Sequence, residues 1–399
     1  MQAIVVLHNE DAKQMSEQTL LSKVESALSS AWGGSVELSF QERIEDHPHV
    51  ARLTVLKAPA SAPKTVILKR SRGEGEERFT EASASHFFHE WANTEFLTTL
   101  LGDQQLAPQI YAGDRTERFF VLEDLGDSVP LNQALWGGDS SLATQVLIHY
   151  GELLGRLHGE TASHFDDYTQ IQQRLNPSLA LPPETYMDYF RDQITNLERL
   201  GIELPPSALS EIQEAAAKLS HPNDFSAFTH GDPVFGNIID WQGRWRFIDF
   251  EAARFRNALL EGIYPRLFFP TSGLRDVMRI PEAVWRQSET AYRTVLSQYL
   301  PVASDDALYG SGMTAACAFW TLTFTETWLE RIIAGNLPPE MLNRIRQCAI
   351  ARFESLVTTS QEFQSLMSLG DFCAGLAAKF RAQWGDEACN LPLYPAFSA

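Results

Sequence analysis

The pattern of apolar and polar residues in the first third of the chain predicts a mixed α and β region. Apolar residues recur at helical spacing from Glu17 to Ala31, and Gly33-Gly34 ends that pattern. Three segments of alternating or continuous apolar character then predict strands over Val36–Gln41, Val50–Leu56 and Lys64–Arg70. A second helix is predicted over Ser83–Leu101, and two further strands are predicted at Tyr111 and over Phe119–Leu122.

Helical spacing dominates the chain after Gly126. It predicts helices over Ser141–His158, Tyr186–Leu200 and Ala208–Leu219, and nearly continuous helix from Pro281 onward with loops at Asn336–Pro339 and Leu369-Gly370. A short strand-like interlude spans Phe225–Phe250. The predicted fold class is therefore α+β, with a small β-rich lobe over residues 1–122, a connection at 123–126 and a larger, mostly helical lobe over 127–399. Two unrelated domains are the alternative reading of the same pattern.

The segment with the clearest chemistry runs from Thr229 to Glu251. It reads Thr-His-Gly-Asp-Pro-Val-Phe-Gly-Asn, then two strand-like stretches separated by the turn signal Asp-Trp-Gln-Gly, and then Ile-Asp-Phe-Glu. A hairpin folded about Gly243 would place Asn237 opposite Asp249, with Cβ atoms about 5 Å apart. Asp232 lies five residues before Asn237 on a tight loop, so it can face the same site.

Oxygen ligands of this kind suit Mg²⁺, which usually takes one or two carboxylates and completes its shell with substrate phosphates. Transfer of a phosphoryl group from ATP needs one carboxylate to orient the attacking hydroxyl, and an Asn and an Asp to hold metal ions on the phosphates. The pattern therefore favours Asp232 as the catalytic base and Asn237 and Asp249 as metal ligands. A chance turn followed by a helix-capping Asp249 is the structural alternative.

His-Gly-Asp-x-x-x-x-Asn followed by Ile-Asp-Phe-Glu resembles the motif of the aminoglycoside phosphotransferase and choline kinase family. These are small-molecule kinases with a two-lobed protein-kinase-like fold. The upstream segments that resemble the same family are Val66–Lys69, Glu90–Leu97, Ala107–Ile110, Phe120–Gly126 and Leu154–His158. The resemblance covers roughly residues 36–261, and the remainder has only the expected helical character.

The resemblance assigns Lys69 to the ATP phosphates and Glu90 to an ion pair with that lysine. Independently, Lys69 ends an apolar strand, from which a point charge could reach phosphates, and a surface lysine is the alternative. Arg70 is the rival for this role, and Glu81 and Glu95 are rivals for that of Glu90. At the connection, the main chain of residues 123–125, represented by Glu123 and Leu125, is expected to hydrogen-bond the adenine.

The sequence also departs from the family pattern. No glycine-rich loop joins the first two predicted strands, and no GxxxxGK[ST] segment occurs, which excludes a P-loop enzyme. Beyond Asp249, the places usually taken by a glycine, a proline and an aspartate hold Arg256, Ala258 and Glu261. Glu261 can still hold the His230 loop by accepting backbone hydrogen bonds, although an exposed helix glutamate is the alternative.

Composition and charge exclude several classes of protein. The 44% hydrophobic and 21% charged residues are ordinary for a globular protein, and a net charge of −19 disfavours a general binder of nucleic acid. The four cysteines, at 317, 348, 373 and 389, have no metal-ligand spacing, and the longest apolar stretch is shorter than a membrane span. We therefore expect a cytoplasmic protein that binds neither membranes nor nucleic acid.

The leading hypothesis is an ATP- and Mg²⁺-dependent kinase that phosphorylates a hydroxyl of a small molecule. A non-catalytic kinase-like nucleotide-binding module is the main alternative, and a hydrolase with a metal on His230 and Asp232 is a further one. The acceptor stays open between aminoglycoside, choline-like, sugar and amino-alcohol compounds. Acidic residues that could meet a cationic acceptor, but that could equally be solvated surface carboxylates, are Asp166, Asp167, Asp188 and Glu326.

Overall fold

The computed structural model describes residues 3–44, 49–71, 81–102, 105–126, 128–175, 186–267, 277–385 and 390–398 of the chain, with residues 3–16, 81–85, 324–328 and 330 described by their backbone alone. The chain divides into two compact units. The first comprises Met1–Ser128, Asp167–Ala180 and Arg246–Ala252. The second comprises Val129–Asp166, Leu181–Trp245 and Ala253–Ala399.

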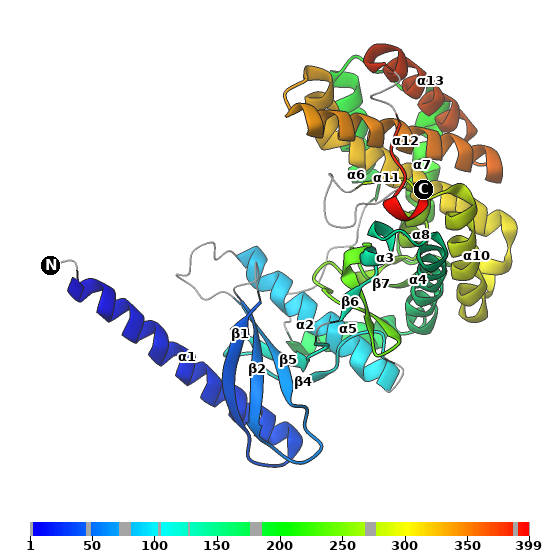
Figure 1. Ribbon diagram of the computed structural model, residues 1–399. Coiled ribbons are helices and arrows are strands. Elements are labelled where there is room, and N and C mark those ends of the chain that lie inside the picture. The colour runs from blue at the N-terminus through cyan, green and yellow to red at the C-terminus, as the bar shows by residue number, and fades with distance from the viewer. Residues whose placement is uncertain are drawn as a thin grey trace. The chain divides into compact units, whose positions relative to one another are not determined.

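The first unit is built on a five-stranded antiparallel sheet with the strand order β1-β2-β3-β5-β4 (Figure 1). Its strands are β1 (Glu37–Arg43), β2 (Val50–Lys57), β3 (Thr65–Arg70), β4 (Ile110–Asp114) and β5 (Phe119–Glu123). Its helices are α1 (Ala3–Trp32), α2 (Glu81–Leu101) and most of α5 (Phe165–Leu175). The predicted order of one helix, three strands, one helix and two strands is confirmed.

The two faces of this sheet carry separate apolar clusters. On one face, Val66 and Leu68 of β3 pack with Val24 and Leu28 of α1. On the other face, Ile67 packs with a cluster from α2, β5 and α5. Because successive strand residues point to opposite faces, Lys69 lies on the same face as Ile67, the face covered by α2.

The second unit is mainly helical. Its helices are α3 (Asn132–Trp136), α4 (Ser140–Thr161), α6 (Tyr186–Arg199), α7 (Pro206–Leu219), α8 (Leu259–Gly262), α9 (Tyr264–Leu267), α10 (Glu282–Tyr299), α11 (Asp306–Ala334), α12 (Pro339–Phe363) and α13 (Met367–Trp384), with 3-10 turns at Phe235–Asn237, Pro301–Ser304 and Pro395–Phe397. Its strands are β6 (Val129–Pro130), β7 (Ser226–Thr229), β8 (Ile238–Trp241), β9 (Arg244–Phe247, which runs into the first unit) and β10 (Arg254–Asn257). They form a β10-β7 pair and a β6-β8-β9 sheet.

A row of glycines on α4 allows α10 to approach closely. Gly151, Gly155 and Gly159 recur every fourth residue, so they share one face of α4. A Cβ atom added at Gly151 would lie 2.1 Å from the carbonyl oxygen of Ser288 on α10. Contact this close between two helix backbones requires glycine, so this row sets the α4–α10 spacing and anchors the C-terminal end of α4, where His158 lies.

One predicted loop is wrong. Leu369 and Gly370 lie inside α13, and the break falls earlier, where Gln364 and Leu366 adopt left-handed backbone conformations with φ of 49° and 52°. Gly370 is a packing residue here, because a Cβ atom at this position would lie 3.0 Å from the Cβ of Ser360 on α12. A glycine in a sequence pattern therefore marked a close contact between helices rather than a turn.

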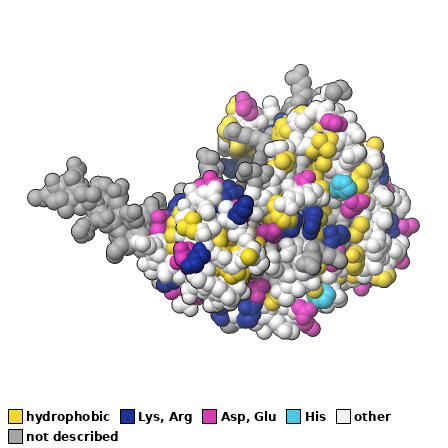
Figure 2. Space-filling view, turned by 60° about the horizontal axis from the view of Figure 1, so that its bottom comes forward, with side chains coloured by type: hydrophobic (Ala, Val, Ile, Leu, Met, Phe, Trp, Pro, Cys, Tyr) yellow, Lys and Arg dark blue, Asp and Glu magenta, His cyan; other side chains and the backbone are white. Residues whose placement is uncertain are grey.

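Other sequence-based predictions concern the cysteines and the membrane. Cys317, Cys348 and Cys373 are buried thiols outside any disulfide, and Cys389 lies outside the described residues. Among the helices that the structure describes, none combines the length and the apolar character needed to cross a membrane. On the face drawn in Figure 2, basic, acidic and apolar side chains of the described residues are interspersed.

Candidate active site

The side chains of Lys69 and Glu90 form an ion pair in the first unit, between the end of β3 and the middle of α2. Both are mostly buried, with 20% and 13% of their side-chain surface exposed. Of the two rivals of Glu90, Glu95 pairs with Arg174 instead, and the side chain of Glu81 lies outside the description. Arg70, the rival of Lys69, points to the opposite face of the sheet because it follows Lys69 directly.

Negative charge dominates around this pair. Burial lowers the pKa of Lys69, but the charges of Glu90, Asp249 and Glu251 outweigh it and leave that pKa above its ordinary value. Burial raises the pKa of the Glu90 carboxyl, and the like charges of Asp249 and Glu251 raise it further, against the attraction of Lys69. One ammonium thus faces three carboxylates, a surplus of negative charge that a divalent cation would neutralise.

Asp249 lies on a segment that contacts within the first unit hold in place. Its backbone is left-handed, with φ of 68°, an uncommon conformation for a residue other than glycine. On its C-terminal side, the buried amide of Asn93 on α2 donates to the carbonyl oxygen of Phe250 at 2.7 Å. On its N-terminal side, the N–H of Phe247 donates to the carbonyl oxygen of Leu106 at 2.8 Å. Asp249 is therefore presented by a fixed backbone beside the Lys69–Glu90 pair.

The connection after β5 is braced by side chains. Arg246, only 3% exposed, donates to Glu123 at 2.5 Å and to Gln105 at 3.0 Å. The bond with Arg246 engages the carboxylate of Glu123 within the protein. The backbone N–H of Glu123 is engaged as well, because it donates to the carbonyl oxygen of Gln109 at 2.8 Å. The carbonyl of Leu125 accepts a hydrogen bond from Ser128.

In the second unit, the loop after β7 presents Asp232. Gly231 has φ of 90°, a conformation that favours glycine, and it turns the chain directly before the exposed Asp232. The amide nitrogen of Asn237 donates to the carbonyl oxygen of Asp232 at 3.0 Å, and the N–H of Asn237 donates to Val234 at 2.9 Å. Asn237 thus closes the loop with its NH₂ group.

Glu261 holds the Asp232 loop through backbone hydrogen bonds, as the sequence indicated. Its fully buried carboxylate accepts hydrogen bonds from the N–H groups of His230 at 3.1 Å and Gly231 at 2.6 Å. It also contacts the ring of His158 at 2.9 Å. Burial would raise the pKa of Glu261, but the hydrogen bond with His158 and the charge of Arg256 lower it to about 2. The alternative of an exposed helix glutamate is wrong.

Arg256, which in the sequence is only a departure from the family pattern, also holds this loop, a contact that the sequence did not predict. Its guanidinium donates to Glu261 at 2.9 Å, to the hydroxyl of Thr229 at 2.9 Å and to the carbonyl oxygen of Gly231 at 3.4 Å. The five-residue spacing from Arg256 to Glu261 was the available signal. It has no meaning until β10 pairs with β7, which brings Arg256 opposite Ala227 and close to the loop.

The hairpin is centred differently from the prediction. Strand β8 ends at Trp241 and strand β9 begins at Arg244. The turn between them therefore consists of Gln242 and Gly243, with φ of 54° and 78°. Positive φ at both positions is typical of a two-residue type I′ turn, which is centred between these residues rather than on Gly243. The predicted register is therefore one residue off. Asn237 belongs to the second unit and Asp249 to the first, so their sharing of one metal ion remains a prediction.

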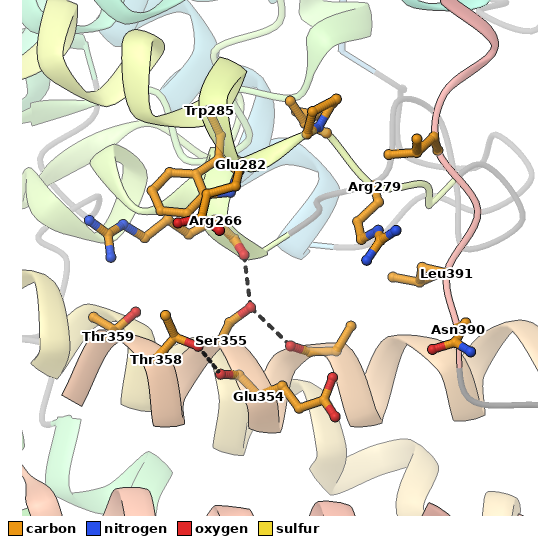
Figure 3. A pocket seen from close by; sticks show the side chains of 14 residues that line it. Arg266, Arg279, Glu282, Trp285, Glu354, Ser355, Thr358, Thr359, Asn390 and Leu391 are labelled. Atoms are coloured by element: carbon orange, nitrogen blue, oxygen red, sulfur yellow. Dashed lines mark hydrogen bonds between the residues drawn. The ribbon is translucent and has the colours of Figure 1, made fainter. Parts of the chain in front are cut away.

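In the part of the chain that the structure describes, one cavity and the possible clusters of metal ligands can be compared with the predicted site. A cavity of about 430 Å³ in the second unit lies between the start of α10, α12 and the C-terminal segment, and it contains none of the predicted site residues (Figure 3). Within the described ranges, no group of three or more His, Cys, Asp or Glu side chains could hold a metal ion. Such a group is not required by the hypothesis, which uses one Asn and one Asp with substrate phosphates.

Comparisons with solved structures give distant similarities. Choline kinase LicA from Streptococcus pneumoniae is 16% identical with a TM-score of 0.38, covering 85% of this chain and 99% of that one. Macrolide 2′-phosphotransferase MphH from Brachybacterium faecium is 14% identical with a TM-score of 0.42, covering 84% and 97%. Amicoumacin kinase hAmiN, solved with AMP-PNP and Ca²⁺, is 14% identical with a TM-score of 0.49, covering 88% and 96%.

No curated protein matches the chain in sequence. The model of the phosphotransferase enzyme family matches residues 56–261, more than half of the 399 residues. The matched segment begins in β2 and ends at Glu261, so it includes both the Lys69–Glu90 pair and the Asp232 loop. The predicted α+β, protein-kinase-like fold class is confirmed, and the chain belongs to the phosphotransferase enzyme family.

Proposed function

We propose that the protein transfers the γ-phosphoryl group of ATP to a hydroxyl of a small-molecule acceptor. The observation that carries this proposal is the mostly buried Lys69–Glu90 pair beside Asp249, in a chain of the phosphotransferase family. Lys69 contacts the ATP phosphates, and Glu90 orients Lys69. The main chain at Glu123 and Leu125 holds the adenine through groups other than the Glu123 N–H and the Leu125 carbonyl, because these two already make hydrogen bonds with Gln109 and Ser128.

Asp232 acts as the base that orients the acceptor hydroxyl and accepts its proton. Its exposure on a loop tied down by Glu261 and Arg256 supports this role, because a general base needs both access to the acceptor and a fixed position. The carboxylate stays where the loop presents it while the proton moves from the acceptor oxygen to an oxygen of Asp232.

Mg²⁺ would be held by Asn237 and Asp249. Both offer the hard oxygen ligands that this ion prefers. The surplus of carboxylates around Lys69 supports a cation there, because ATP phosphates would otherwise meet the negative charges of Glu90, Asp249 and Glu251. When bound, the ion would neutralise charge on the phosphates during transfer.

The non-catalytic nucleotide-binding module remains the second candidate. The hydrolase hypothesis gains no support: the His230 ring is fully buried and its Nδ1 accepts the N–H of Asp232 at 3.3 Å. Of the four carboxylates that could meet a cationic acceptor, Asp188 pairs with Arg191 at 2.6 Å, the side chain of Glu326 lies outside the description, and Asp166 and Asp167 are exposed.

A nucleotide-binding assay and an acceptor screen test the proposal together. A ligand present at a hundredfold excess over its Kd stabilises the native state by about 2.7 kcal/mol. We therefore expect ATP with Mg²⁺ to raise the thermal midpoint more than ATP alone, and ADP release to appear with one class of alcohol in a panel. Binding without ADP release from any alcohol would favour the non-catalytic module, and the absence of any nucleotide effect would overturn both readings.

A further inference from the structure

The helix α5 groups with the first unit from Asp167 onward. It follows α4 directly in the chain and has one strongly apolar face. Tyr168, Gln172 and Leu175 are buried, with 2%, 8% and 1% of their surfaces exposed. An eleven-residue helix does not hold itself in water, so these contacts decide its position.

Those contacts are made with α2, the helix that carries Glu90. Leu175 and Ile171 join the apolar cluster that includes Trp91 of α2. The rings of Tyr168 and Phe96 pack edge to face with their centroids 5.4 Å apart. At the edge of the contact between α5 and α2, Arg174 pairs with Glu95. The contacts run along α2 from Trp91 to Phe96, beginning one residue after Glu90.

The same cluster also reaches the strand that carries Lys69. Ile67 of β3 packs against it and lies two residues before Lys69, on the same face of the sheet. The hydroxyl of Thr94, farther along α2, donates to the carbonyl oxygen of Glu90 at 2.8 Å. One apolar cluster therefore contains residues of α5, the α2 residue that follows Glu90 and the β3 residue two positions before Lys69.

We propose that α5 is a positioning element that holds α2 against the sheet at the depth at which Glu90 meets Lys69. Leu175 is its main positioning residue, because it is the most deeply buried α5 side chain in the shared cluster. The importance of the pair for ATP rests on the proposed function, whereas the positioning itself is a property of the first unit. The chain that leads from α4 toward α6 thereby acts on the geometry of the ATP-phosphate lysine.

The test compares Leu175→Ala with Leu38→Ala in the full chain. Leu38 is 6% exposed in the same unit but belongs to the cluster on the α1 face of the sheet. Both changes delete the same atoms from a buried site, so they share the general cost of a cavity. Only Leu175→Ala removes support from α2. Ile171→Ala is the milder variant for the case in which Leu175→Ala does not fold, and Leu175→Met is the conservative rescue.

The readout is the rate at which a small amine-reactive acylating reagent labels Lys69 under native conditions, followed by peptide mass spectrometry across pH 7–10. Loss of the Glu90 carboxylate lowers the pKa of Lys69 and uncovers its amine, so labelling should rise by about tenfold for each pH unit that the midpoint moves. Glu90→Gln gives the reference rate for an unpaired lysine.

We expect Leu175→Ala to label at a rate approaching that of Glu90→Gln, while Leu38→Ala and Leu175→Met label like the wild type. Equal labelling of the Leu175→Ala and Leu38→Ala variants, whether both fast or both slow, would overturn the proposal. The assay needs neither nucleotide nor acceptor. A protein that behaves as expected here but does not bind ATP would therefore refute the proposed function and leave the role of α5 standing.

Discussion

Replacement of Glu261 by Gln tests how the Asp232 loop is held. The carboxylate is fully buried and takes hydrogen bonds or charge from His158, His230, Gly231 and Arg256. Glutamine keeps the size of the side chain but removes the negative charge. Without that charge, the buried Arg256 guanidinium no longer has a carboxylate partner at this position. Removal of one member of a buried pair typically costs about 3–5 kcal/mol, and we expect the free energy of unfolding at pH 7 to fall by that amount.

The pH dependence gives an independent magnitude. A carboxyl whose pKa falls from 4.5 to about 2 on folding stabilises the folded state by about 3 kcal/mol at neutral pH. Because the folded-state pKa is the lower one, this stabilisation is complete above about pH 5 and is lost as the pH falls through 4.5 toward 2. The wild type should therefore lose this stability between pH 5 and pH 2.5, and Glu261→Gln should lack that component.

Urea unfolding followed by tryptophan fluorescence at several pH values measures both effects. Glu354→Gln is the control, because the Glu354–Arg381 pair is a half-exposed contact at 2.7 Å, for which a cost below about 1 kcal/mol is expected. Two results would refute the reasoning. One is a cost for Glu261→Gln no larger than that of the control, and the other is the same fall in stability with acid in the wild type and Glu261→Gln.

Three further predictions use other parts of the molecule. Asp249→Ala should abolish the extra thermal stabilisation that Mg²⁺ adds to ATP, whereas Asp232→Asn should retain it; equal loss in both variants would contradict the separate roles. Asp232→Asn should lower phosphoryl transfer by about 10²-fold or more in a coupled ADP assay while nucleotide affinity stays unchanged, and full activity would exclude a general base at this position. Gly151→Ala places a Cβ atom 2.1 Å from the Ser288 carbonyl oxygen, so it should cost about 1–3 kcal/mol in urea unfolding; an unchanged midpoint would show that the α4–α10 seam can open without cost.

The sequence by itself predicted the order of the elements up to β5 and the candidate catalytic motif. Helical and strand periodicity depend on residues a few positions apart, so α2, β3 and β5 could be predicted with errors of one or two residues at their ends. Strand alternation likewise places Lys69 on the same face of the sheet as Ile67 and Arg70 on the opposite face. The predicted position of Asn237 opposite Asp249 depended on a local hairpin. Even there, the two-residue turn placed the centre of the hairpin between Gln242 and Gly243, half a residue before the predicted centre at Gly243.

Tertiary structure alone decided which distant side chains meet. Glu261 and His158 are 103 residues apart in the chain, and their contact follows from the packing of α4 and α8 rather than from any local pattern. The family resemblance already implied Glu90 as the partner of Lys69; the physical cause of that choice over Glu95 is the rotation of α2 against the sheet, which pairs Glu90 with Lys69 and Glu95 with Arg174. Helix α5 shows the limit most clearly: its amphipathic face requires a partner, but periodicity does not say which one. Packing against α2 decided it, because burial of apolar surface is non-directional and only the assembled fold selects the surface that is covered.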